Sequence, residues 1–159
     1  MSAMGDEYEV VVAGGGIAGL TAGLTSARLG RCTLVLTGGV PGGLLLGVDS
    51  IEGLAGFPEG VAGYELDPLV QDQAMAAGAD FSMAELDGLE TEDGSWRAGG
   101  VLTHAVIVAT GSRLKEIGVA GEDRLRGSGV SHCASCDAPL VEDQIVGVVG
   151  AAIRRARKR

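Results

Sequence analysis

The sequence of 159 residues lacks any apolar run long enough to cross a lipid bilayer. Its opening, MSAMGDEYEV, is acidic and does not resemble a secretory signal. Cysteine is scarce: the three present are an odd number, which in a chain without an export signal favours the reducing cytosol over a disulfide scaffold. We therefore expect a cytoplasmic protein with no membrane partner.

Basic residues are also scarce, except at the C-terminal end. The net charge is −9, and all 21 acidic residues precede position 154, whereas five of the last six residues are Arg or Lys. An acidic body disfavours nucleic acid as a partner, and the basic end has no aromatic residue to stack on bases. We interpret residues 151–159 as a basic tail translated in a shifted reading frame, in place of a helix expected after the glycine turn at Gly150. The nucleotide sequence of the gene tests this interpretation.

Glycine, by contrast, is abundant, with 28 residues, which suits an α/β protein with many tight turns. The patterns predict a strand at 8–13, a helix at 17–29 ended by Gly30, and a strand at 32–36, which together form a βαβ unit. A long ordered loop at 38–63 and a helix at 64–77 follow. Further strands are expected at 80–86, at 88–98 with a hairpin turn at Asp93-Gly94, and at 102–109.

A G-x-G-x-x-G pattern, formed by Gly14, Gly16 and Gly19, lies between the first expected strand and helix. The first glycine permits the turn, the second lets the backbone approach a pyrophosphate, and the third lets helix pack on strand. This context favours a dinucleotide site over a plain turn. The acidic residue expected about 20 residues further on, to hold a ribose hydroxyl, is absent, because the second strand ends in Leu36-Thr37.

The second motif is Cys133-Ala134-Ser135-Cys136-Asp137. Two thiols at this spacing can close a small disulfide ring, and neighbouring charges can lower the pKa of one thiol. The alternative is a zinc site that also uses His104 and His132, but there is no second C-x-x-C pair, so a redox pair is favoured. Cys32, placed within an expected strand, is interpreted as a buried apolar residue.

The motifs together resemble the N-terminal half of a bacterial thioredoxin reductase, of the FAD- and NAD(P)-dependent pyridine nucleotide-disulfide oxidoreductases. The matching stretches follow the family's order over residues 8–150: VVAGGGIAGLTAG, PGGLLL, IEGLAGFPEGVAGYEL, QAMAAGADF, VIVATGS, GVSHCASCD and IVGVVG. The resemblance implies an α/β, Rossmann-like fold. It assigns residues 1–112 to the first portion of a discontinuous FAD-binding domain and residues 113–150 to the start of an NADPH-binding domain.

The resemblance also implies roles for individual residues. The FAD pyrophosphate would lie on Gly14, Gly16, Ala18 and Gly19. The ribose and flavin side would be lined by Thr37, Gly38, Gly42 and Gly43, with Ala109, Thr110 and Gly111 closing over the cofactor. Cys136 would face the flavin, Cys133 would attack the partner disulfide, and Asp137 would act as general acid and base. Relatives usually have amide side chains that contact the flavin where this chain has Leu44 and Gly53.

The activity implied is reduction of a thioredoxin-like protein, with electrons passing from NADPH through FAD to the cysteine pair; full-length relatives suggest a homodimer. Because the second nucleotide site is incomplete in the sequence, we expect the chain as given to be truncated and inactive, with no bound metal. The alternatives are a peroxiredoxin-reducing flavoprotein, a dithiol oxidase, or a non-catalytic fragment of an FAD domain.

Overall fold

A computed structural model describes residues 7–112, 115–133 and 141–149. The chain divides into two compact units, Met1–Gly111 and Ser112–Arg159. Most of the regular structure lies in the first unit, in the order β1 (Glu7–Ala13), α1 (Ile17–Arg28), β2 (Thr33–Leu36), a 3₁₀ turn η1 (Gly43–Gly47), α2 (Gly63–Ala76), β3 (Asp80–Ser82), β4 (Leu89–Glu92), β5 (Ser95–Ala98) and β6 (Val101–Val108). Among the described residues of the second unit, the regular structure is a short helix, α3 (Glu122–Leu125).

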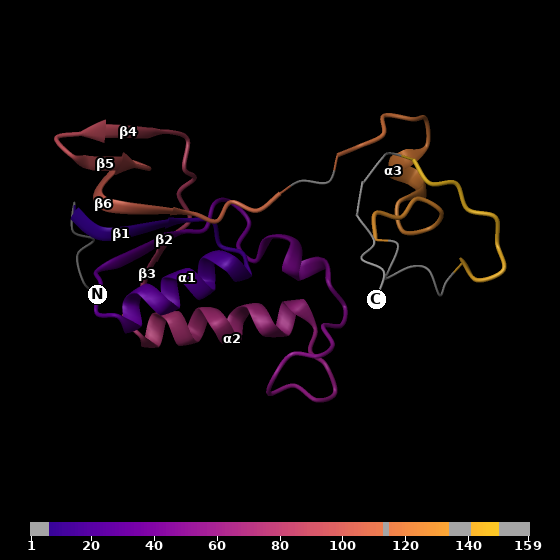
Figure 1. Cartoon of the computed structure of the whole chain (residues 1–159), viewed down its shortest axis with the longest axis horizontal. Helices are drawn as coiled ribbons and strands as arrows, with labels where there is room; N and C mark the ends of the chain where they lie inside the picture. Colours follow the sequence, from indigo (N-terminus) through magenta and orange to yellow (C-terminus); the bar gives the residue numbers. More distant parts are fainter. Residues whose placement is uncertain (1–6, 113–114, 134–140, 150–159) are drawn as a thin grey trace, which may run out of the picture. The chain divides into compact units, whose positions relative to one another are not determined.

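The six strands form one sheet in the order β3-β2-β1-β6-β5-β4 (Figure 1). The strands β3, β2, β1 and β6 run parallel, with Val11 opposite Leu34 on one side and Val106 on the other. The strands β4 and β5 are antiparallel and connect to the start of β6. The expected α/β, Rossmann-like fold is confirmed. The carboxyl ends of its parallel strands lie side by side, and we call this the carboxyl edge of the sheet.

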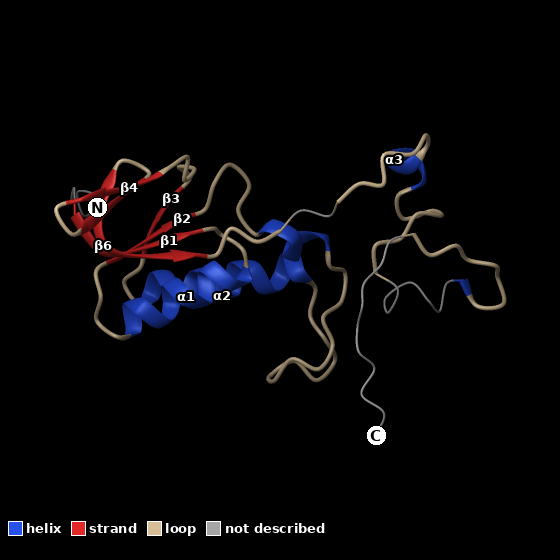
Figure 2. Ribbon diagram, turned by 45° about the horizontal axis from the view of Figure 1, so that its top comes forward, coloured by secondary structure: helices blue, strands red, loops and turns tan. Residues whose placement is uncertain are grey.

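The helices α1 and α2 cover one face of the parallel strands (Figure 2). They pack through small residues: Ala27 of α1 and Ala74 of α2 form a buried cluster with Ala79. Gly23 is required at the face of α1 that meets β2, because a Cβ there would lie 2.5 Å from Cγ2 of Val35. Helix α1 ends at Arg28, and Gly30, two residues further on, has a φ of +76° that suits glycine, as expected from the sequence.

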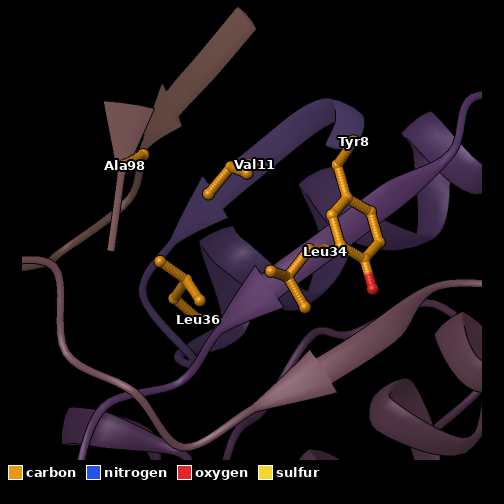
Figure 3. Packing of buried hydrophobic residues seen from close by; sticks show 5 residues of the cluster. All are labelled: Tyr8, Val11, Leu34, Leu36 and Ala98. Atoms are coloured by element: carbon orange, nitrogen blue, oxygen red, sulfur yellow. The ribbon is translucent and has the colours of Figure 1, made fainter. Parts of the chain in front are cut away.

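The other face of the sheet carries the main apolar core, shown in Figure 3: Tyr8, Val11, Leu34, Leu36 and Ala98. Ala98 belongs to β5, so the antiparallel hairpin contributes to the same core as the parallel strands. The hairpin turns at Asp93 and Gly94, both with positive φ (48° and 83°), which is the geometry of a type I′ turn. The predicted Asp93-Gly94 turn is confirmed.

Two expectations from the sequence are corrected here. The strand expected over 80–86 ends at Ser82, because the chain then turns so that the Ala84 carbonyl accepts from the Gly38 amide at 3.3 Å. Cys32 is exposed and free, not buried. It precedes Thr33, the first residue of β2, and therefore escapes the two-sided burial of that strand; its amide donates to the Glu9 carboxylate at 2.9 Å.

In the second unit, Glu122 organises the loop before α3. Its side chain accepts from the amides of Ile117 (3.0 Å) and Gly118 (2.8 Å), and the residue is buried. Among the residues described by the structure, no helix is long and apolar enough to span a membrane. Residues 150–159, which include the basic tail at 151–159, lie outside the described residues, as do Cys136 and Asp137.

Candidate functional site

The glycine turn between β1 and α1 lies at the carboxyl end of the parallel strands, where open α/β sheets bind ligands. The turn is held by neighbouring strands: the Gly14 amide donates to the Leu36 carbonyl at 2.8 Å, and the Ala109 amide donates to the Ala13 carbonyl at 2.8 Å. The ends of β2 and β6 are thereby fixed on either side of the turn.

Gly14 and Gly19 are glycines because the backbone leaves no space for a side chain. A Cβ on Gly14, whose φ is +121°, would collide with the Ala109 carbonyl and lie 3.1 Å from the Thr110 nitrogen. A Cβ on Gly19 would collide with the Gly14 carbonyl. The third glycine of the motif therefore allows α1 to approach the turn, as expected for a dinucleotide-binding motif.

The loop after β2 meets the same turn. A Cβ on Gly15 would lie 2.7 Å from the Thr37 Cβ, and the Gly42 amide donates to the Gly15 carbonyl at 3.0 Å. A Cβ on Gly43 would lie 3.8 Å from the Gly16 Cα. The structure therefore brings together three of the sequence segments expected to form one site: the glycine turn, the paired glycines Gly42-Gly43, and Ala109-Thr110.

Helix α1 begins beside these segments without a side-chain cap. Its N-cap is Gly16, which has no side chain to accept from the first amides, and there is no acidic residue in the first turn. The first amides of a helix have no partner within the helix, and they carry the positive end of the helix dipole. A bare helix start surrounded by glycine backbone has the shape and polarity to take a pyrophosphate group, so the residues present fit a dinucleotide.

The contacts around the glycine turn described above do not include three of the expected site residues, Ala18, Gly38 and Gly111. Ala18 lies in the first turn of α1 but is exposed, and its side chain lines a shallow apolar concavity of about 520 Å³ with Thr21 and Ile107. Gly38 lies at the end of β2 with φ +73°, against the side chain of Glu85. Gly111 is exposed with φ +74°, and a Cβ there would meet no atom within 4 Å.

The cysteine motif lies in the second unit and is described only in part. Cys133 is disulfide-bonded and half-buried, and its amide donates to the Ser131 hydroxyl at 3.1 Å. Within the described residues no three His, Cys, Asp or Glu side chains are grouped to hold a metal ion, but Cys136 and Asp137 are not among them.

The family model described as pyridine nucleotide-disulphide oxidoreductase matches residues 8–153. The chain belongs to this family. The thioredoxin reductase of Mycolicibacterium smegmatis is 38% identical over 154 residues, which are 94% of this chain and 50% of the relative. The thioredoxin reductase of Streptomyces coelicolor is 39% identical over 154 residues, 92% of this chain and 48% of the relative.

Solved structures of this oxidoreductase family show the same fold. A thioredoxin reductase from Gloeobacter violaceus matches with a TM-score of 0.64 and 30% identity, over 86% of this chain and 47% of that one. The thioredoxin reductase of T. acidophilum matches with a TM-score of 0.65 and 32% identity, over 86% of this chain and 46% of that one. The resemblance predicted from the sequence is confirmed, and the chain spans about half the length of the relatives it matches.

Proposed function

We propose that the glycine-lined edge of the sheet binds FAD, and that the protein serves the NADPH-dependent reduction of a thioredoxin-like disulfide. The observation that carries this proposal is the convergence of Gly14–Gly16, Gly42-Gly43 and Ala109-Thr110 at the uncapped start of α1. Likeness to thioredoxin reductases supports the same conclusion.

In this proposal the pyrophosphate lies against Gly14, Gly16, Ala18 and Gly19, where backbone amides and the α1 dipole offset its charge. Thr37, Gly38, Gly42 and Gly43 line the ribose and flavin side, and Ala109, Thr110 and Gly111 close over the cofactor. When bound, FAD would accept a hydride from NADPH and supply two electrons to a disulfide. The chain's own contribution there is to bind and orient the cofactor.

The thiol chemistry is assigned to Cys133, Cys136 and Asp137. The Cys133 thiolate attacks one sulfur of the partner's disulfide, and the departing thiolate takes a proton from Asp137. The Cys136 thiolate then attacks the Cys133 sulfur, which releases the reduced partner and restores the disulfide in this chain. Cys32 has no part in this exchange.

The domain assignment is part of the same proposal: residues 1–112 contribute to FAD binding, and residues 113–150 begin an NADPH-binding domain. The division of the chain after Gly111 supports that boundary. From the family resemblance, the proposal also includes a cytoplasmic location and a homodimeric assembly.

Two measurements test the proposal. Purified protein mixed with FAD and freed of excess cofactor should show the visible absorption of bound flavin; protein that retains none would contradict the FAD site. Thiol titration should be done in a Cys32→Ser variant, because the exposed Cys32 would add a reactive thiol. Two thiols per chain should appear on reduction and disappear on mild oxidation, whereas a stoichiometric zinc ion would overturn the redox role.

A further inference from the structure

The end of β2 has no carboxylate, although dinucleotide sites of the βαβ type usually hold the ribose hydroxyls with an acidic residue there. Thr37 occupies this position and is buried. Its hydroxyl lies 3.2 Å from the carbonyl oxygen of Ser82 and 3.3 Å from that of Gly38, so its proton is donated to the backbone. A single buried hydroxyl cannot replace the two oxygens of a carboxylate.

The neighbouring strand supplies an acidic residue at the same place. Because β3 is parallel to β2, the chain leaving β3 runs beside the chain leaving β2: the Thr37 amide donates to the Ser82 carbonyl at 2.8 Å. Glu85 comes three residues after Ser82. A Cβ on Gly39 would lie 3.6 Å from Glu85 Oε1, and a Cβ on Gly38 would lie 3.9 Å from Glu85 Cγ.

The Glu85 carboxylate is available to a ligand. The residue is exposed, and among the described residues its carboxylate makes no hydrogen bond or ion pair. The residues it lies against, Gly38 and Gly39, have no side chains that could cover it. A free carboxylate beside the end of β2 has the charge and the two acceptor oxygens that vicinal ribose hydroxyls require.

We propose that Glu85 is a nucleotide-binding residue that accepts hydrogen bonds from the ribose hydroxyls of the adenosine half of the cofactor. The β3–β4 connection thus supplies the carboxylate that the end of β2 lacks. This inference rests on the proposed FAD site, and it assigns a residue that the glycine motif and its usual spacing do not indicate. An acidic residue that is merely solvated on the surface is the alternative.

The test compares ADP with 2′-deoxy-ADP and 3′-deoxy-ADP by isothermal titration calorimetry, using the whole chain. The variants are Glu85→Gln, which removes the charge and one acceptor oxygen, and Asp87→Asn as a matched control. Asp87 is also exposed and lies two residues away, where it lines a concavity with Gly88 and Arg97. Thermal melts of both variants check that folding is unchanged.

Hydrogen bonds to a charged group have energies that correspond to about a tenfold or larger change in affinity. We expect the unaltered chain to bind ADP about tenfold more tightly than at least one deoxy analogue. Glu85→Gln should weaken ADP binding by a similar factor and abolish the discrimination, whereas Asp87→Asn should change neither.

The outcomes separate this inference from the proposed function. If ADP binds but the deoxy analogues bind equally well, or if Glu85→Gln keeps the full discrimination, the role of Glu85 is wrong while the nucleotide site stands. If the unaltered chain binds neither ADP nor FAD, both the site and the role of Glu85 are wrong.

Discussion

The hydroxyl of Tyr8 donates a hydrogen bond to Oδ2 of Asp80 at 3.1 Å, across 72 positions of sequence. Tyr8 belongs to β1 and Asp80 to β3, and β2 lies between these strands in the sheet. The ring of Tyr8 is buried in the main core, and its hydroxyl points toward the outer strand β3 (Figure 3). The pKa of Tyr8 is raised to about 12. Burial is the largest cause, and the hydrogen bond to Asp80 and the negative charge of Asp80 add to it.

Tyr8→Phe should lower the free energy of unfolding by about 1 kcal/mol, because one hydrogen bond is lost while the ring stays buried. The raised pKa adds a pH dependence. The neutral phenol stabilises the fold fully below pH 10.0, and this contribution is lost as the pH rises toward about 12. Ultraviolet difference titration in a Tyr64→Phe background, which leaves Tyr8 as the sole tyrosine, measures the ionisation. Ionisation near pH 10.0 in the folded protein would contradict the buried hydrogen bond.

Asp67, in α2, is a buried carboxylate whose Oδ1 has no hydrogen-bond partner among the described residues. Desolvation raises its pKa, so the ionised group opposes folding at neutral pH. Asp67→Asn removes the charge and should raise the free energy of unfolding at pH 7 by about 1 kcal/mol. The advantage should shrink as the pH falls through the raised pKa, because Asp67 then becomes neutral in the folded protein.

Chemical denaturation at several pH values measures this effect, with Asp72→Asn on the exposed part of the same helix as control. The control should change stability little at any pH. If Asp67→Asn instead destabilises the protein at neutral pH, the ionised carboxylate must have a partner in solution.

Glu122 holds the loop before α3 by accepting from the amides of Ile117 and Gly118. These two bonds favour the ionised form and hold the pKa of Glu122 below its usual range. The stabilisation is therefore present above pH 4.5 and is lost as the pH falls through the lowered pKa. Glu122→Ala should release the loop, whereas Asp123→Ala, at an exposed neighbour, should not.

Amide chemical shifts of Ile117 and Gly118, followed by nuclear magnetic resonance, report the loop directly. They should titrate below pH 4.5 in the unaltered chain and lose that titration in Glu122→Ala. Faster amide hydrogen exchange at both positions is expected in this variant at neutral pH. Unchanged exchange would mean that the loop is held without Glu122.

Gly19→Ala tests the close approach of α1 to the glycine turn. The added methyl group would collide with the Gly14 carbonyl, so the helix must shift, which should cost about 1–3 kcal/mol of stability and weaken FAD binding. Gly88→Ala is the matched control, because a Cβ at Gly88 meets no atom within 4 Å and its φ is not positive. Melting temperature and FAD retention are measured on both variants. Retention of FAD and full stability in Gly19→Ala would contradict the steric role.

The sequence by itself determined the features that depend on neighbouring residues. The βαβ unit, the G-x-G-x-x-G turn, the stop at Gly30 and the Asp93-Gly94 hairpin follow from local periodicity and from backbone angles that favour glycine. These patterns also carried the family resemblance, which assigned a set of residues to one nucleotide site. Most of those residues lie at the carboxyl ends of the parallel strands.

Only the tertiary structure decided which distant residues meet. The order β3-β2-β1-β6 brings Thr37, Glu85 and Ala109 to one edge of the sheet, and no local pattern connects their positions. The tertiary structure also decided which residues are exposed. Cys32 is exposed because it lies one residue before the buried strand β2, whereas Asp67 is buried although aspartate is usually exposed. The pairing of strands far apart in the chain depends on the whole set of packed contacts, because each pairing must repay the entropy of closing a long loop.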